Sequence, residues 1–212
     1  MKRILKSDAD VQKFNDWASK KGFSRWEEFS GSDEFKRVRE HIGVIEQGDV
    51  SAYTEQPLNK RLWHIDHFRK RDLYPRLTFD YSNLLVDNRN DNYGACHKDS
   101  HKAKVSAADF DGKDCIFNPV EENFADYIRY NTAGELLPAV GLEDSLSRRV
   151  ERTIEVFNIN HPSLVERRAD LIQNMTDYMK GGLSVSEIST CLKPQGFHTL
   201  IDWWLSNMSV AQ

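Results

Sequence analysis

The sequence predicts a mainly α-helical protein with one small, loop-rich module that contains two short strands. Apolar residues recur at helical spacing towards both ends of the chain. Residues 49–105 are instead rich in Asn, Asp, Gly and Pro, and their apolar runs are short, the clearest being Leu62–Phe68 and Leu84–Val86. We therefore expect three regions: N-terminal helices over residues 1–48, the module over 49–117 and a helical C-terminal region over 118–212.

Two helices are expected before the module. Ser7 or Asp8 can cap a first helix that runs to Lys20. Four apolar residues then step by three, four and three positions, so that they would form one stripe along a second helix: Phe35, Val38, Ile42 and Ile45. The Gly48-Asp49 pair is expected to end this helix.

Helical spacing returns after the module. Leu142, Leu146 and Val150 begin a helix that continues to Phe157, and a further helix is expected from Leu164 to Met179. Ser184–Glu187 has the pattern of a capping box, and Phe197–Leu205 is a strongly apolar last helix. Its adjacent Trp203 and Trp204 are more typical of a core or a subunit interface than of a ligand site.

Composition indicates a soluble cytoplasmic protein. No apolar run approaches the roughly 18 residues that cross a bilayer, and the basic segment Met1–Lys6 is followed by no apolar stretch of the kind found in secretory signals. The three cysteines are widely spaced, so we expect no disulfide framework. A net charge of −4 disfavours a protein that coats nucleic acid through bulk charge. Basic residues are nevertheless concentrated locally, at Lys60, Arg61, Arg69, Lys70, Arg71 and Arg76 and again at Lys98, Lys102 and Lys104.

An ordered set of polar residues in the module has the composition of a metal site. His97 and His101 are four residues apart, and on a helix this spacing places both imidazoles on one face, where they could bind one divalent ion. Asp66 could complete the ligand set. The neighbouring His67 could accept a proton near neutral pH, as a general base does.

This set, with Asn83 between its two halves, resembles the HNH or ββα-metal nucleases. The resemblance implies that Asp66, His97 and His101 bind one divalent ion (Mg, Mn or Zn), which neutralises the scissile phosphate while His67 activates water. It also implies that Asn83 orients the imidazole of His67. Basic residues flanking the motif would contact the nucleic acid, namely Arg69, Lys70, Lys98 and Lys102.

Further stretches resemble one HNH branch, the nuclease subunits (PtuB) of Septu-type and retron-associated anti-phage systems. They are Ser51–Glu55, His64–Lys70, Asn118-Pro119, Arg152–Asn160 and Leu164–Arg168. The branch implies a hetero-oligomer with a PtuA-like ATPase, hydrolysis of DNA and in some systems a retron RNA/DNA partner. We expect the ATPase to contact the helical segments, with Trp203 and Trp204 as candidate anchors.

The chain departs from this branch at its cysteines. The branch has a structural zinc set, whereas this sequence has Ser51, Thr54 and Asp87 at three of those positions and keeps only Cys96. Hydroxyl groups cannot replace thiolates, so we expect no structural zinc and a hydrogen-bonded cluster instead. His64, two residues before Asp66, would share its strand face and is a further possible ligand.

Two alternatives remain open from the residues alone. The same site could cut RNA, for example tRNA in a retron-type toxin, because both phosphodiester backbones suit it. The chain could instead be a catalytically inactive adaptor that only binds a partner.

Overall fold

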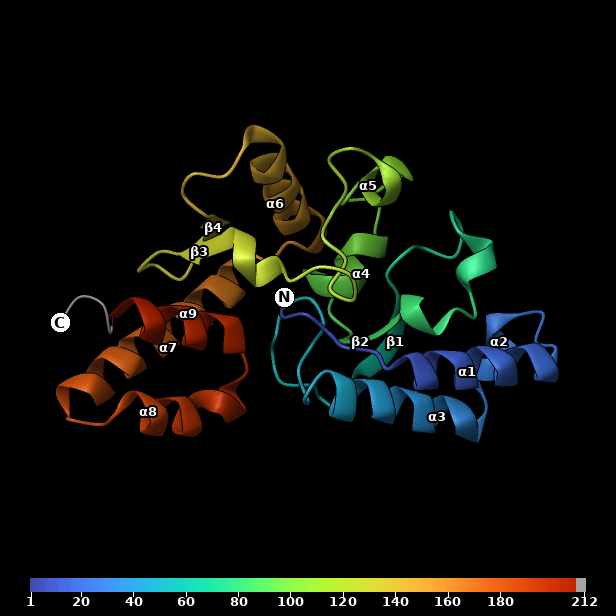
Figure 1. Ribbon diagram of the computed structural model, residues 1–212, viewed down its shortest axis with the longest axis horizontal. Coiled ribbons are helices and arrows are strands. Elements are labelled where there is room, and N and C mark those ends of the chain that lie inside the picture. The colour runs from blue at the N-terminus through green and yellow to red at the C-terminus, as the bar shows by residue number, and fades with distance from the viewer. Residues whose placement is uncertain (209–212) are drawn as a thin grey trace.

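The computed structural model describes residues 1–208 as a mainly helical protein with two small antiparallel hairpins (Figure 1). The elements before the C-terminal half are α1 (Asp8–Lys21), α2 (Trp26–Ser30), α3 (Asp33–Glu40), β1 (Trp63–His67), β2 (Leu84–Asn88), α4 (Gly94–Asp99) and α5 (Ala108–Asp111). Those of the C-terminal half are β3 (Ile128–Tyr130), β4 (Leu136–Pro138), α6 (Asp144–Phe157), α7 (Pro162–Lys180), α8 (Val185–Leu192) and α9 (His198–Met208). Helices α1–α3 lie at one end of the molecule, α7–α9 at the other, and α4 between them (Figure 1).

The first predicted helix is confirmed as α1. The Ser7 side chain accepts a hydrogen bond from the Asp10 amide, and Gly22 ends the helix in the left-handed conformation with φ of 65°. The second predicted helix is α3, which continues into a π-helical turn, His41–Glu46. Because a π-turn bonds each residue to the fifth along, the apolar stripe loses its phase. Ile42 is fully buried, but Ile45 is 71% exposed, so its assignment to the stripe was wrong.

The β1–β2 hairpin separates two hydrophobic cores. Its register pairs Trp63 with Asn88 and His67 with Leu84. Leu84 and Val86 pack with the N-terminal helices, whereas Leu85 belongs to the larger core of the C-terminal half. This is the alternation that a strand buried on both faces produces. Cross-strand partners share a face, so Asp66, opposite Leu85, lies on the α4 side of the hairpin.

The motifs of the C-terminal half serve its packing. Arg168 is buried and donates to the carbonyls of Gly134 and Ile159 and to the Asn160 side chain. Asn160 in turn bonds both backbone groups of Leu136 on β4. The stretch Leu164–Arg168, which carries part of the resemblance, therefore contributes to the hydrogen bonds that join α7 to the β3–β4 hairpin.

The predicted capping box is present at the start of α8, where Ser184 and Glu187 bond reciprocally. The apolar face of α9 is turned inward: Phe197, Leu200, Ile201 and Leu205 are buried in the core. Most of the apolar surface that suggested a partner-binding helix is thus used within the chain. Among the described residues, no helix combines the length and the apolar composition that a membrane span requires.

Candidate functional site

The predicted motif lies at the end of β1 and on α4, which follows the hairpin. Asp66 is 3% exposed, and its carboxylate lies 3.1 Å from the Lys98 ammonium on α4. The hydroxyl of Tyr53 donates a hydrogen bond to the same carboxylate. Burial and this contact raise the pKa of Tyr53 well above its usual value, so the phenol remains protonated as the donor.

Lys98 does not face solvent. Its side chain is 0% exposed, and its ammonium also donates to the carbonyls of His67 and Phe68 and lies 3.2 Å from Asp99. The sequence-based expectation that Lys98 contacts nucleic acid was therefore wrong. Of the other basic residues expected there, Lys70 lines the pocket described below, Arg69 pairs with Asp111 and Glu121, and Lys102 is exposed.

The ring of His67 is held from two directions. Its Nε2 lies 2.9 Å from the carbonyl oxygen of Thr78, and the Trp26 ring packs edge-on at 4.3 Å between centroids. A carbonyl can only accept, so Nε2 carries the hydrogen and Nδ1 has the lone pair. Burial lowers the pKa of His67 to about 4, against the opposing effects of Thr78 and Asp66. The imidazole is therefore neutral at pH 7.

Asn83 does not bond the His67 ring. Its side chain accepts from the Arg69 amide at 2.7 Å and donates to the carbonyls of Arg69 and Leu77. Its backbone carbonyl accepts from the Phe68 amide at 3.0 Å. The expectation that Asn83 holds the imidazole directly is corrected: it closes the loop that connects β1 to β2, and so fixes the backbone next to His67.

The two histidines expected on one helical face are separated. Helix α4 ends at Asp99, and the extended Ser100 caps it, with its hydroxyl donating to the His97 carbonyl at 2.7 Å. His101 therefore lies beyond the helix and is exposed. The Nδ1 of His97 lies 2.9 Å from the Val156 carbonyl on α6. Successive helical residues are rotated by about 100°. His97 therefore faces α6, whereas Lys98, the next residue, faces Asp66.

The expected metal ligands do not form a site. In the chain as far as residue 208, the three ligand-type side chains that come together are Asp10, His41 and Glu46, outside the predicted motif. Lys6 lies 2.8 Å from Glu46 and already compensates that carboxylate. Asp66, His97 and His101 thus do not fit a divalent ion as predicted.

The side chains of Ser51, Thr54 and Asp87 are linked by the expected hydrogen bonds. Ser51 donates to Asp87, and the hydroxyl of Thr54 lies 3.0 Å from that of Ser51. Asp87 also accepts from the Ala95 amide at 2.7 Å, which ties β2 to the start of α4. Burial raises the pKa of Asp87 to about 7, although these donors act in the opposite direction.

A pocket of about 870 Å³ opens beside the end of β1. Its charged lining comprises Lys70, Arg71 and Arg89 together with Asp66, Asp72 and Asp99, and His64 and His67 also line it. Sequence reasoning missed Arg89, Asp99 and the Trp26 wall, because their sequence neighbours give no sign that they share a cavity. The Nδ1 of His64 is buried without a hydrogen-bond partner among the described residues, and burial lowers the pKa of this histidine.

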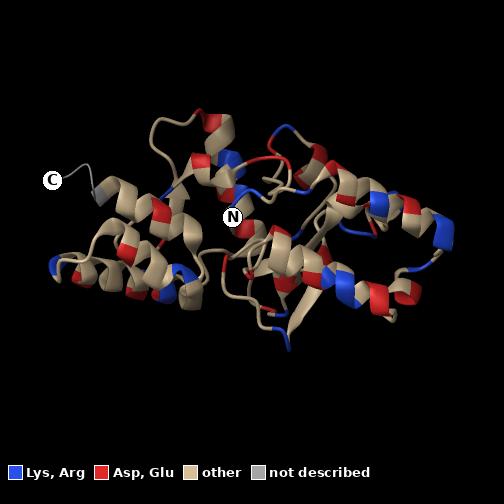
Figure 2. Cartoon of the chain, turned by 60° about the horizontal axis from the view of Figure 1, so that its bottom comes forward, with Lys and Arg blue, Asp and Glu red and all other residues tan. Residues whose placement is uncertain are grey.

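Charge elsewhere is mixed. Acidic and basic positions are interspersed along α1 and α3 at one end of the molecule and along α7 at the other (Figure 2). The clustering of basic residues in the sequence is thus only partly retained in space, since Arg71 lies 3.5 Å from Glu27.

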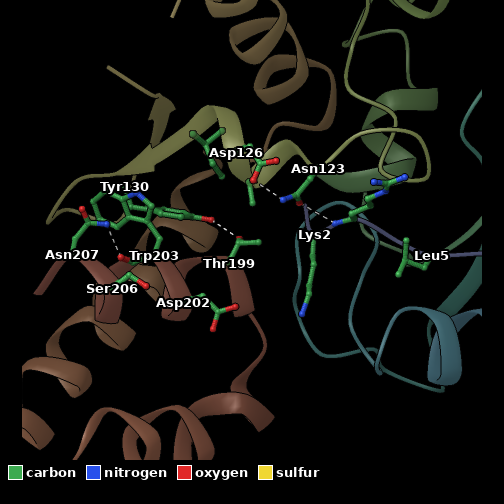
Figure 3. A pocket seen from close by; sticks show the side chains of 13 residues that line it. Lys2, Leu5, Asn123, Asp126, Tyr130, Thr199, Asp202, Trp203, Ser206 and Asn207 are labelled. Atoms are coloured by element: carbon green, nitrogen blue, oxygen red, sulfur yellow. Dashed lines mark hydrogen bonds between the residues drawn. The ribbon is translucent and has the colours of Figure 1, made fainter. Parts of the chain in front are cut away.

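A second pocket lies between the N-terminal segment, β3 and α9 (Figure 3). Trp203 lines it beside Tyr130, whose hydroxyl lies 2.8 Å from that of Thr199. Trp204 is partly buried against the core and does not line this pocket. Of the two tryptophans expected to contact a partner, Trp203 is thus the one that borders a cavity.

No protein-family model matches the chain, and no curated protein has a matching sequence. The resemblance to HNH nucleases therefore stays a hypothesis from the sequence motif.

Proposed function

We propose that the chain is an HNH-type endonuclease that hydrolyses phosphodiester bonds of DNA. The observation that carries the proposal is the state of His67: neutral, with Nε2–H directed at the Thr78 carbonyl. This leaves Nδ1 as the basic nitrogen of a ring that lines an open pocket. A neutral ring whose second nitrogen carries a lone pair can accept a proton, as a general base must.

The pocket can also receive the phosphate. Lys70, Arg71 and Arg89 line it and can bind non-bridging oxygens. His67 would accept a proton as a water oxygen attacks phosphorus, while the bond to the leaving sugar oxygen breaks and that oxygen takes a proton from solvent. Holding the water and the phosphate together is itself a large part of such catalysis.

We further propose, from the sequence patterns shared with Septu-type nuclease subunits, that the chain works beside an ATPase in anti-phage defence. If so, the protein isolated intact from its native host should co-elute with ATP hydrolysis. A monomeric chain that is fully active and elutes apart from any ATPase would overturn this part of the proposal.

The catalytic proposal is tested by incubating the purified protein with supercoiled plasmid and, separately, with total tRNA. Each incubation is carried out with Mg²⁺ and with EDTA. His67→Ala should abolish cleavage in protein that circular dichroism shows to be folded, while His198→Ala, a partly exposed histidine on α9, should cut like the wild type. Wild-type rates in His67→Ala would remove this residue from the mechanism, and cleavage of tRNA alone would change the substrate to RNA.

One observation favours a second candidate, a non-cleaving adaptor. The predicted metal ligands are apart, and Asp66 is neutralised by Lys98. If the chain is an adaptor, the wild type and His67→Ala should both bind the ATPase normally. Neither should cut plasmid or tRNA in any buffer.

A further inference from the structure

The ammonium of Lys98 is surrounded by oxygen atoms from two parts of the chain. It lies 3.1 Å from Asp66 and 3.2 Å from Asp99, and it donates to the main-chain carbonyls of His67 and Phe68. Carboxylate and carbonyl oxygens are the donors that hard divalent cations prefer. In this protein a side-chain ammonium, itself 0% exposed, fills their centre.

We infer that Lys98 supplies the resident cation of this site, in the place where a ββα-metal nuclease would hold a divalent ion, and that its ammonium excludes such an ion. Both carboxylate oxygens of Asp66 contact the ammonium, and one of them also accepts from Tyr53. His97, the helix residue expected to complete a metal site, is turned to Val156. A metal would have to displace a cation that has no exposed surface.

The ammonium of Lys98 changes the net charge of the pocket. Its lining carries three basic side chains and three carboxylates, so by itself it would attract a polyanion weakly. Lys98 adds one positive charge beside Asp66 and Asp99, so that the four basic groups exceed the three carboxylates by one. Lys98 is thus a positioning residue: it sets the charge of the site and holds the backbone carbonyl of His67.

The inference that Lys98 excludes a divalent ion does not depend on whether the protein cuts nucleic acid. Its consequence for catalysis, that cleavage persists in EDTA, rests on the proposed function. A test must therefore read out metal binding directly, and it must separate this site from the cluster of Asp10, His41 and Glu46.

The experiment is a titration with Mn²⁺ monitored by the imidazole signals of His67 in ¹H–¹³C spectra, in a His41→Gln background. A paramagnetic ion bound at Asp66 would broaden those signals because His67 is the adjacent residue. We expect no broadening at stoichiometric Mn²⁺ with Lys98 present. Lys98→Ala should create a Mn²⁺ site that broadens His67, and the Asp66→Asn/Lys98→Ala double variant should lose it again.

Broadening of His67 at stoichiometric Mn²⁺ in the presence of Lys98 would overturn the inference, and this arm holds even if Lys98→Ala fails to fold. A folded Lys98→Ala protein that gains no Mn²⁺ site would overturn the assignment of these oxygens as a cation position. If the His67 signals stay unbroadened and the protein cuts nucleic acid in no buffer, the inference is supported and the proposed function is wrong.

Discussion

Lys98 and Asp66 form an ion pair that is closed off from water, with 3.1 Å between nitrogen and oxygen and exposed fractions of 0% and 3%. Such a pair contributes little net stability as a whole, because each charge has lost its hydration. Removing one member is different, since the other charge stays buried without compensation. The pair therefore predicts a specific pattern of unfolding energies.

Lys98→Met should lower the free energy of unfolding by about 3–5 kcal/mol, the usual effect of an uncompensated buried charge. The Asp66→Asn/Lys98→Met double variant should be less destabilised than Lys98→Met alone. Urea denaturation measures all three proteins. Lys36→Met is the matched control, because Lys36 and Asp33 form an exposed pair at 3.0 Å that is worth less than about 1 kcal/mol. Equal losses in Lys98→Met and Lys36→Met would contradict the buried pair.

Gly94, the first residue of α4, should tolerate no side chain. Its φ is +70°, and a Cβ there would lie 2.2 Å from a carboxylate oxygen of Asp87. Gly94→Ala should cost about 3 kcal/mol or more, from backbone strain of about 1–2 kcal/mol plus the steric conflict. Gly22→Ala separates the two effects, because Gly22 has a φ of +65° and nothing within 4 Å. Similar losses in both variants, measured by urea denaturation, would show that Asp87 does not crowd Gly94.

The local elements of the site could be predicted from the sequence, and their side-chain directions could not. The two apolar runs became β1 and β2, because short apolar segments between turn-forming residues have few other ways to be buried. The helix expected to carry both His97 and His101 starts at Gly94 and ends at Asp99, before His101. A hydrogen bond from Ser100 to its last turn cannot be foreseen from spacing, and the pairing of His97 with His101 failed for that reason.

The burial of Lys98 could not be predicted from the sequence. Lysine is almost never fully buried. From the sequence, a lysine between two expected metal-site histidines is therefore expected to be exposed to solvent and to contact nucleic acid. Its burial follows from long-range partners, Asp66 and the carbonyls of His67 and Phe68, which meet it only after the hairpin and α4 have docked. The hydrogen-bonded cluster of Ser51, Thr54 and Asp87 was predictable because hydroxyl and carboxyl side chains bond to one another when they lie close together.

Asp87 should make stability depend on pH in one direction. Its pKa is raised to about 7, so the folded protein retains a proton that the unfolded chain releases near 4. The stabilisation is complete below about pH 4 and is lost as the pH rises through 7. Asp87→Asn removes this dependence, and the wild type should lose on the order of 3–4 kcal/mol relative to it across that range. Parallel stability curves for the two proteins, from urea denaturation at several pH values, would show that Asp87 is ionised in the folded state.

His67 should act on stability in the opposite direction. Burial lowers its pKa to about 4, so between pH 6.5 and 4 the unfolded chain binds a proton that the folded protein does not. The wild type should therefore lose stability relative to His67→Gln as the pH falls through this window, by on the order of 3 kcal/mol, with no further change below 4.

The titration of the His67 ring in ¹H–¹³C spectra checks the same pKa directly, with an expected midpoint near 4. Because the base is already neutral above this value, any cleavage should have no acidic limb attributable to His67 between pH 5 and 8. A midpoint near 6.5 would mean that the ring is solvated rather than enclosed between Trp26 and the Thr78 carbonyl. The tautomer that makes Nδ1 the proton acceptor would then no longer be fixed, and the case for His67 as the general base would lose its structural support.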